Sequence, residues 1–312
     1  MSIRSKNAPR AFLQWTRISL APSALADALI GISLGSHGNF PGFLLVLQAC
    51  LASLLVFMGG MGLNDWADRK QDALKRPGRP IPAGNLSATA ALPLSLLLLL
   101  SGTGLAFLIH PTAGACLGLV ALSATAYDLV LRGPTFGPLC LAFCRAGNLT
   151  FGMLAVRSSL GLPWDDALLL PPIAYGLYVG LISVLSGYED GARPLNQRGP
   201  RRVLSCASIV LAGLPFSTMA LRPGPQSWAY ALAFIISIGA AARLWHAAHR
   251  SKPWTCAAVR QAMGLSLRRL MLATAALGCA ALKATLFPWL AVLCALGGLA
   301  FSVRLRKSFP PS

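Results

Sequence analysis

Long apolar stretches constrain the fold of this chain more than any other feature of its sequence. A bilayer core about 30 Å thick is crossed by roughly 20 apolar residues in a helix. Ten stretches of about this length are present, or nine if the last two form one irregular unit. They cover residues 18–36, 43–63, 88–109, 112–131, 137–156, 167–187, 203–221, 227–247, 266–286 and 288–304. We therefore expect an all-α, polytopic transmembrane bundle of nine to ten helices that forms a single domain over residues 1–312.

The composition agrees with a membrane protein and argues against a water-soluble one. Hydrophobic residues make up 55% of the chain and charged residues only 12%, about half the charged fraction of soluble domains. The formal net charge of +18 is compatible with nucleic-acid binding. However, the Lys and Arg residues occur in short clusters between apolar stretches, which is typical of a topology signal and not of a basic binding face. We therefore expect a lipid bilayer as a partner, and no nucleic acid.

Basic clusters on alternate loops predict the orientation of the chain. Loops 64–87, 188–202 and 248–265 are rich in Arg and Lys, and so are both termini. The intervening loops contain almost no basic residue beyond Arg157 and Arg222. By the positive-inside rule, the basic loops and both termini lie in the cytoplasm. The sequence thus predicts a multi-pass protein of the plasma membrane, or of the inner membrane in a bacterium.

Acidic residues are scarce, and most of them fall in two of the predicted cytoplasmic loops. Asp65, Asp68 and Asp72 lie within about a 60° arc if the second helix continues through them, and Asn64 adds an amide oxygen nearby. Such oxygen ligands suit Mg²⁺, which often takes one or two carboxylates together with a substrate phosphate. The spacing alone is equally consistent with a solvated helix end whose carboxylates pair with neighbouring Arg and Lys.

The segment after these acids is stiff and basic. Residues 75–84 read Lys-Arg-Pro-Gly-Arg-Pro-Ile-Pro-Ala-Gly, and the three prolines and two glycines predict a non-helical loop. A stiff loop that carries Lys75, Arg76 and Arg79 is suited to fold over a bound polyanion. These features favour a Mg²⁺–polyanion site over a solvated helix end.

From Asn64 to Gly84 the chain resembles the first signature of the UbiA superfamily of intramembrane prenyltransferases. The signature reads Asn-Asp-x-x-Asp-x-x-x-Asp, followed by basic residues and Arg-Pro-Ile-Pro-Ala-Gly. The resemblance implies a helical bundle around a central cavity, and Mg²⁺-dependent transfer of a prenyl group from an isoprenoid diphosphate to a small, commonly aromatic acceptor. By position, it implies that the diphosphate and metal are held by Asn64, Asp65, Asp68 and Asp72, with Arg69, Lys75, Arg76 and Arg79 as diphosphate contacts.

The second acidic motif departs from the family pattern. The family has two Asp residues four positions apart after the sixth span, whereas this chain has adjacent Glu189 and Asp190, which would point about 100° apart on a helix. They remain the candidates for the second metal-binding position, with Asp190 joining Asp65 and Asp68 as catalytic residues and with Tyr188 and Arg193 as substrate contacts. The departure keeps two alternatives open: a non-catalytic relative that binds or transports a lipid or metabolite, and an intramembrane terpene cyclase.

Polar residues inside the predicted spans indicate a polar cavity. Arg145 and Asn148 are three residues apart in the fifth span, and a charge at that depth normally faces the bundle interior. Pairing of Arg145 with Asp27 or Asp128 is the alternative interpretation. The Cys-Arg-x-x-Asn element that contains these two residues, together with the altered second motif, is similar to the EboC-like branch of the superfamily. The resemblance also suggests Tyr127, at the end of the fourth span, as a substrate contact.

Overall fold

The computed structural model describes residues 8–189, 195–221, 226–250 and 253–308, and within them the chain forms helices and no strand. The helices of the first half are α1 (Ala8–Trp15), α2 (Ala21–Gly35), α3 (Phe43–Ala67), α4 (Arg69–Lys75), α5 (Ala88–Ile109), α6 (Pro111–Leu129) and α7 (Phe136–Ser159). Those of the second half are α8 (Leu170–Val184), α9 (Ser186–Glu189), α10 (Gly199–Gly213), α11 (Ser227–Arg250), α12 (Cys256–Gly278) and α13 (Leu286–Ser308). Three short 3₁₀ turns are η1 (Asp166–Leu169), η2 (Leu214–Thr218) and η3 (Cys279–Ala281).

Each of the ten predicted apolar stretches coincides with a helix, so the predicted all-α bundle is confirmed. In the described residues, seven helical segments are long and apolar enough to cross a membrane: α3, α5, α6, α7, the continuous segment Asp166–Glu189, α11 and α13. The 15-residue α2 is apolar but shorter. That α2, α10 and α12 complete a set of ten spans stays a prediction.

Among the predicted helices, the one expected over residues 266–286 differs most from the observed helix, which is α12. This helix starts at Cys256, where the side chain of Thr255 accepts a hydrogen bond from the amide of Ala258. Its first turns are amphipathic, with Val259 buried and Arg260 exposed, so a search for uniformly apolar residues does not detect them. The helix therefore begins earlier than the apolar stretch that predicted it.

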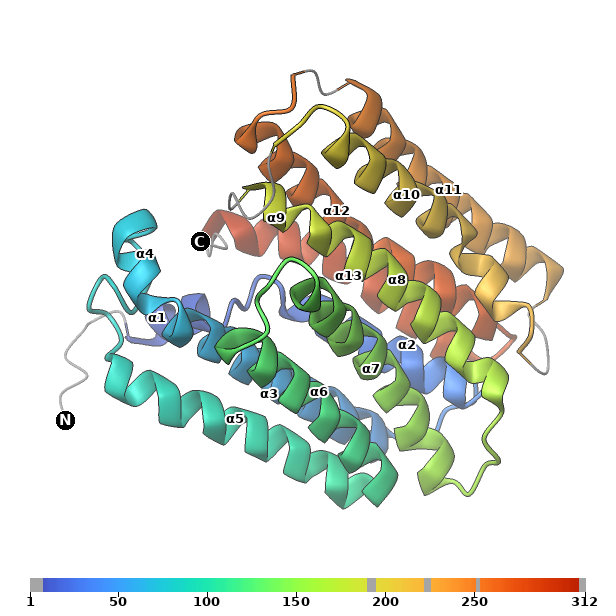
Figure 1. Cartoon of the computed structure of the whole chain (residues 1–312). Coiled ribbons are helices and arrows are strands. Elements are labelled where there is room, and N and C mark those ends of the chain that lie inside the picture. The colour runs from blue at the N-terminus through green and yellow to red at the C-terminus, as the bar shows by residue number, and fades with distance from the viewer. Residues whose placement is uncertain (1–7, 190–194, 222–225, 251–252, 309–312) are drawn as a thin grey trace.

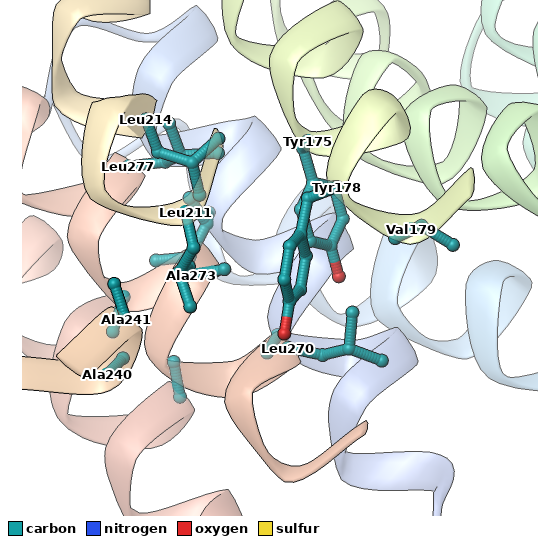
Figure 2. Packing of buried hydrophobic residues seen from close by; sticks show 14 of the residues in the cluster. Tyr175, Tyr178, Val179, Leu211, Leu214, Ala240, Ala241, Leu270, Ala273 and Leu277 are labelled. Atoms are coloured by element: carbon teal, nitrogen blue, oxygen red, sulfur yellow. The ribbon is translucent and has the colours of Figure 1, made fainter. Parts of the chain in front are cut away.

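The helices form two packed groups, joined by α2 and by the packing of α7 on α8 (Figure 1). In one group α3 packs on α5 and α6 packs on α7; in the other, α10 packs on α11 and α11 packs on α12. Helix α2 contacts α7 on one side and α13 on the other. Each group has its own cluster of buried apolar side chains, and that of the second group surrounds Tyr175 and Tyr178 (Figure 2).

Small residues allow α2 and α7 to cross at backbone contact. A Cβ atom added to Gly31 would lie 2.2 Å from the carbonyl oxygen of Leu149, and one added to Gly152 would lie 2.3 Å from that of Ala28. Close crossings of this kind are common between helices in membranes. The crossing sets the distance between the polar side chains that α2 and α7 carry.

The outer faces of the bundle are apolar. Leu44 on α3 keeps 74% of its surface exposed, and Leu100 and Leu108 on α5 keep 71% and 77%. Contiguous exposed leucines of this size are unfavourable in water but suited to contact with lipid. The exposed faces therefore agree with the membrane location that the apolar helices indicate.

Candidate functional site

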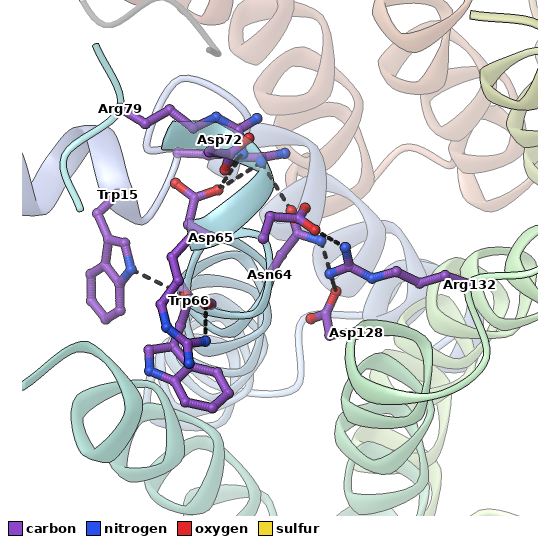
Figure 3. Close-up of polar contacts among 12 residues, drawn as sticks. Trp15, Asn64, Asp65, Trp66, Asp72, Arg79, Asp128 and Arg132 are labelled. Carbon is purple, nitrogen blue, oxygen red and sulfur yellow. Dashed lines mark hydrogen bonds and ion pairs between the residues drawn. The ribbon is translucent and has the colours of Figure 1, made fainter. Parts of the chain in front are cut away.

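Buried carboxylates and arginines form a network of hydrogen bonds and ion pairs where α3 ends, as Figure 3 shows. We call the end of the bundle that holds residues 64–87 the signature end. Asp65 accepts hydrogen bonds from Arg17 at 2.8 Å and from Arg79 at 3.3 Å. Arg79 also donates to Asp72 at 2.5 Å, and the side chains of Arg79, Asp65 and Asp72 are only 2%, 3% and 6% exposed. We call Asp65, Asp68 and Asp72, which were predicted to share one helix face, the acidic stripe. Arg79 thus bridges two buried carboxylates of this stripe.

A second set of contacts ties the signature end to α6 and to the loop that follows it. The amide of Asn64 donates to Asp128 at 2.8 Å and accepts from Arg17 at 3.0 Å. Arg132 pairs with Asp68 and, at 3.3 Å, with Asp128. Partial burial lowers the pKa of Arg132, but the two carboxylates more than offset this and raise it above its ordinary value. The Arg132 guanidinium therefore stays charged.

The local backbone explains why the acids lie near one another. Helix α3 ends at Ala67, but the amide of Asp72 still donates to the carbonyl of Asp68 at 2.8 Å. The acidic stripe therefore stays close to helical spacing across the short break before α4. The loop after α4 is non-helical, as predicted, and it turns back where the carbonyl of Pro80 accepts from the amides of Asn85 and Leu86. Before this turn the amide of Arg79 donates to the carbonyl of Arg76 at 3.1 Å, and Arg79 lies against Asp65 and Asp72.

A cavity of about 430 Å³, which we call the polar cavity, opens beside these side chains. It is lined by five cationic residues, Arg17, Lys75, Arg76, Arg79 and Arg132, and by three acidic ones, Asp68, Asp72 and Glu189. Guanidinium and ammonium groups that line one cavity suit phosphate oxygens. The polar cavity therefore has the chemistry of a diphosphate site.

A second cavity of about 340 Å³, the apolar cavity, extends from the first into the bundle. Its walls come mainly from apolar side chains of α2, α3, α6, α7, α8, α12 and α13. The two cavities share seven lining residues, which are Arg17, Asn64, Tyr127, Leu141, Ser183, Ser186 and Met263. The two cavities therefore adjoin, one with charged walls and the other with mainly apolar walls.

Polar groups on the wall of the apolar cavity are held by α2. Arg145 donates to Asp27 at 2.7 Å, and the fully buried carboxylate of Asp27 also accepts from Tyr175 at 2.9 Å. Asn148 donates to the carbonyl of Ala24 at 2.9 Å. Of the two acids considered as partners of Arg145, Asp27 is therefore the one that pairs with it. Arg145 and Asn148 nevertheless both line the apolar cavity.

The carboxylates do not converge on a single point. Among the described residues, no three His, Cys, Asp or Glu side chains are close enough together to hold a metal ion by themselves. Asp68, Asp72 and Glu189 still line the polar cavity beside the amide of Asn64, and one or two such oxygens suffice when a substrate phosphate completes the Mg²⁺ shell. The donor set therefore fits a metal that binds together with a diphosphate.

Two predicted contacts face away from both cavities. Arg69 lies over the ring of Trp66, 4.2 Å from its centroid, and donates to the carbonyl of that residue at 2.8 Å. Tyr188 is buried against α10, where a Cβ atom on Gly199 would lie 2.4 Å from its hydroxyl. Neither side chain lines the polar or the apolar cavity.

The second acidic motif is only partly described. Glu189 lines the polar cavity and accepts a hydrogen bond from Arg260 at 2.8 Å. Predicted residues Asp190 and Arg193 lie outside the described residues.

Two arginines on the cavity walls were not among the predicted site residues. Arg17 was assigned to the topology signal, yet it contacts both Asn64 and Asp65. Arg268 lies on α12 and lines the apolar cavity. Its signal was present in the sequence, because a cation inside an apolar stretch such as 266–286 is unusual and normally faces a cavity or a partner.

Comparison with known proteins identifies relatives of the chain. The model of the UbiA prenyltransferase family matches residues 24–267. Digeranylgeranylglyceryl phosphate synthase of Methanococcoides burtonii is 30% identical over 214 residues, which are 65% of this chain and 74% of the relative. The bacteriochlorophyll synthase 33 kDa chain of Cereibacter sphaeroides is 29% identical over 161 residues, 50% of this chain and 53% of the relative. A solved UbiA homolog from Archaeoglobus fulgidus, bound to GPP and Mg²⁺, shares the fold with a TM-score of 0.65 over 95% of this chain and 99% of that one, at 13% identity.

Proposed function

The chain belongs to the UbiA prenyltransferase family, and from this premise we propose that it transfers a prenyl group from an isoprenoid diphosphate to a small acceptor, with Mg²⁺ as cofactor. The observation that carries the proposal is that the polar and apolar cavities adjoin and share seven lining residues. An isoprenoid diphosphate has the same division, with a polyanionic head and an apolar chain. Its head fits the polar cavity and its chain fits the apolar one.

In this proposal the diphosphate is bound by the cations of the polar cavity. Lys75 and Arg76 are exposed on the loop side, and Arg132 faces them from the loop after α6. Asp68 and Asp72, with Asn64, would hold Mg²⁺ against the phosphate oxygens. When bound, the metal neutralises diphosphate charge and so makes the diphosphate a better leaving group.

Asp65 takes a different role, because it does not line either cavity. Its carboxylate holds the guanidinium groups of Arg17 and Arg79, so we assign it the positioning of two cations. Asp190 stays a predicted catalytic and metal-binding residue, and Arg193 a predicted substrate contact.

The reaction follows from this placement. The bond between the allylic carbon and the diphosphate oxygen breaks, and its electron pair leaves with the diphosphate, whose growing charge is stabilised by Arg79 and Arg132. An electron pair of the acceptor forms the new bond to the allylic carbon, and the acceptor then loses a proton. The apolar walls, including Phe57 and Met61, keep water from the electron-deficient carbon. Tyr127 lines both cavities, which supports its assignment as a contact of the substrate near the allylic carbon.

The proposal also covers the domain organisation of the chain and its orientation in the membrane. Residues 1–312 act as one domain, because helices from both halves line the apolar cavity. The protein is an integral multi-pass membrane protein, and its basic loops favour the cytoplasmic side for the polar cavity.

The experiment measures binding of geranyl diphosphate, and release of its diphosphate, by the full chain in lipid nanodiscs, with and without Mg²⁺ and with and without 4-hydroxybenzoate as a probe acceptor. We expect both to depend on Mg²⁺ and the variants Asp68→Asn and Asp72→Asn to lose most of the release. Asp166→Asn, a change of the same chemistry at an exposed residue of η1, serves as the matched control. Equal binding with and without Mg²⁺ would overturn the metal assignment. Release that needs no acceptor would indicate a cyclase, and binding without any release a non-catalytic protein.

A further inference from the structure

Three arginines on the outer surface of the second helix group carry charges that no described side chain balances. Arg243 and Arg250 lie on α11, and Arg269 lies on α12. In the part of the chain that the structure describes, none of these three side chains takes part in an ion pair or a hydrogen bond. We call the three side chains the basic patch.

The basic patch lies where α11 packs on α12. Arg243 and Arg250 are seven residues apart, so they point within about 20° of each other from α11. Arg269 is close enough to Arg243 for the two charges to repel each other. Of the unpaired nitrogens of Arg269, only Nε is enclosed by protein, so the terminal nitrogens reach the surface. Two accessible guanidinium groups from neighbouring helices therefore lie beside each other.

The acids of the chain lie elsewhere. Asp165 and Asp166 precede α8, at the end of the bundle opposite Glu189, and Asp190 lies outside the described residues. The other six of the nine acids pair with arginines outside the basic patch: Asp27, Asp65, Asp68, Asp72, Asp128 and Glu189. A second copy of the chain would bring the same acids, already paired in the same way. The described residues therefore supply the basic patch with no counter-ion, either from this chain or from a copy of it.

The basic patch belongs to the signature end of the bundle. Helix α12 starts at that end, because Arg260 near its start pairs with Glu189, which lines the polar cavity. Helix α11 ends shortly before α12 begins, so its last turns lie at the same end. Arg243 is seven residues from the last residue of α11, about 10 Å along the helix. Two turns of α11 thus separate Arg243 from the helix end.

The exposed surface of α11 changes from apolar to basic towards this end. Ile235 and Ile238 are 69% and 54% exposed, as expected for side chains that face acyl chains. Trp245 is 46% exposed and lies two residues after Arg243, and exposed tryptophans of membrane helices are typical of the headgroup level. The surface therefore divides as a phospholipid does, with an apolar part followed by a charged one.

We infer that the basic patch binds an anionic phospholipid of the leaflet at the signature end, with the lipid phosphate between Arg243 and Arg269. An arginine on a membrane helix is costly without an anion, and a guanidinium pairs with phosphate oxygens through two parallel hydrogen bonds. A phosphate between the two arginines replaces their repulsion with two attractions, and Arg250 adds attraction nearer the helix end. Basic pockets between transmembrane helices bind anionic headgroups in this way.

The inference is independent of the proposed function. Arg243, Arg250 and Arg269 line neither the polar nor the apolar cavity, so the lipid occupies a site outside the one that would hold the donor and the acceptor. The lipid would stabilise the contact between α11 and α12 whether or not the protein transfers a prenyl group.

The test measures binding of single lipids to the full chain, delipidated in a non-ionic detergent, by native mass spectrometry. Phosphatidylglycerol and phosphatidylcholine with the same acyl chains are titrated, and the dissociation constant of the first bound lipid is compared. Each arginine near a membrane surface strengthens binding of an anionic lipid about fivefold. We therefore expect the wild-type protein to prefer phosphatidylglycerol by about tenfold or more.

Variants assign the preference to the basic patch. Arg243→Gln combined with Arg269→Gln should abolish most of it, whereas Lys at both positions keeps the charges and should keep most of it. Arg201→Gln is the matched control, because it removes the same charge from an exposed residue of the first turn of α10, outside the basic patch. This turn lies at the same end of the bundle, since Gln197 bonds with Trp254 just before α12. If the double variant does not fold, Arg243→Gln alone changes an exposed residue and should lower the preference about fivefold.

Three results of the lipid titrations overturn the inference: no preference for the anionic lipid in the wild type, a preference that survives in the Arg243→Gln variants, or an equal loss in Arg201→Gln. Two controls exclude other occupants. Displacement of the lipid by glycerol 1-phosphate would assign the basic patch to a soluble phosphate, and a doubled mass that excludes lipid would assign it to a second copy of the chain. Either outcome would also overturn the lipid assignment.

Discussion

The bridge that Arg79 makes between Asp65 and Asp72 gives the sharpest prediction about the site. In Arg79→Gln both carboxylates lose a cation, and Asp72 loses its only ion pair among the described residues, whereas Asp65 keeps Arg17. All three side chains of the bridge are at most 6% exposed. Removing one partner of a buried ion pair costs about 3–5 kcal/mol, because the remaining charge stays buried without compensation.

This cost is large enough to measure by thermal unfolding. At roughly 2–4 °C per kcal/mol for chains of about 150–250 residues, a loss of about 3–5 kcal/mol lowers the Tm by about 6–20 °C. Because Asp72 lines the polar cavity, a divalent cation can replace the lost guanidinium. We therefore expect Mg²⁺ to raise the Tm of Arg79→Gln by several degrees more than that of the wild-type protein.

The assay follows the Tm of the full chain in nanodiscs over a titration of MgCl₂, with NaCl adjusted to keep the ionic strength constant. Arg69→Gln is the matched control, because it removes the same charge at the start of α4, from a residue that lines neither cavity. The double variant Asp72→Asn with Arg79→Gln removes the unpaired carboxylate and should recover most of the lost Tm. The reasoning fails if Arg79→Gln keeps the wild-type Tm, or if Mg²⁺ stabilises both proteins equally.

Three further predictions concern the same framework. Arg145→Gln leaves the fully buried Asp27 without its cationic partner and should cost about 3–5 kcal/mol, whereas the double variant with Asp27→Asn should recover most of this in a double-mutant cycle followed by Tm. Gly152→Leu should prevent the close crossing of α2 and α7, since even a Cβ atom would lie 2.3 Å from a carbonyl oxygen; a stable, folded protein on size-exclusion chromatography would contradict the crossing. Arg76→Gln should weaken binding of geranyl diphosphate about tenfold, as expected for loss of one charged hydrogen bond, while Arg69→Gln should not change the dissociation constant.

Local spacing was sufficient to predict the parts of the site that lie on one segment. Asp65, Asp68 and Asp72 follow a helical period that the short break between α3 and α4 hardly disturbs. The prolines and glycines of 75–84 predicted a non-helical loop, and the structure has one. Both features depend on backbone preferences within about twenty residues, which a sequence expresses directly.

Contacts between distant segments could not be predicted in the same way. The sequence allowed either Asp27 or Asp128 as the partner of Arg145. Which of them pairs with it depends on how closely Gly31 and Gly152 let α2 and α7 approach each other. The position of Arg268 on a cavity wall likewise depends on the packing of α12 against helices from both ends of the chain. The spacing of residues along the chain does not give the distances between packed helices. The partner of Arg145 and the position of Arg268 could therefore not be predicted from it.

The balance of charge explains why arginines form ion pairs with the acidic stripe. The chain has 27 basic residues and only nine acidic ones, and Asp27, Asp65, Asp68 and Asp72 are each paired with an arginine. In a low-dielectric bundle a carboxylate without a cation would be neutralised or would destabilise the fold. The pairs therefore give each of these four carboxylates a cationic partner. In the proposed function, Asp68 and Asp72 would hold the metal, and the arginines that pair with them would then be available to the phosphate oxygens, so that each charge would keep a partner.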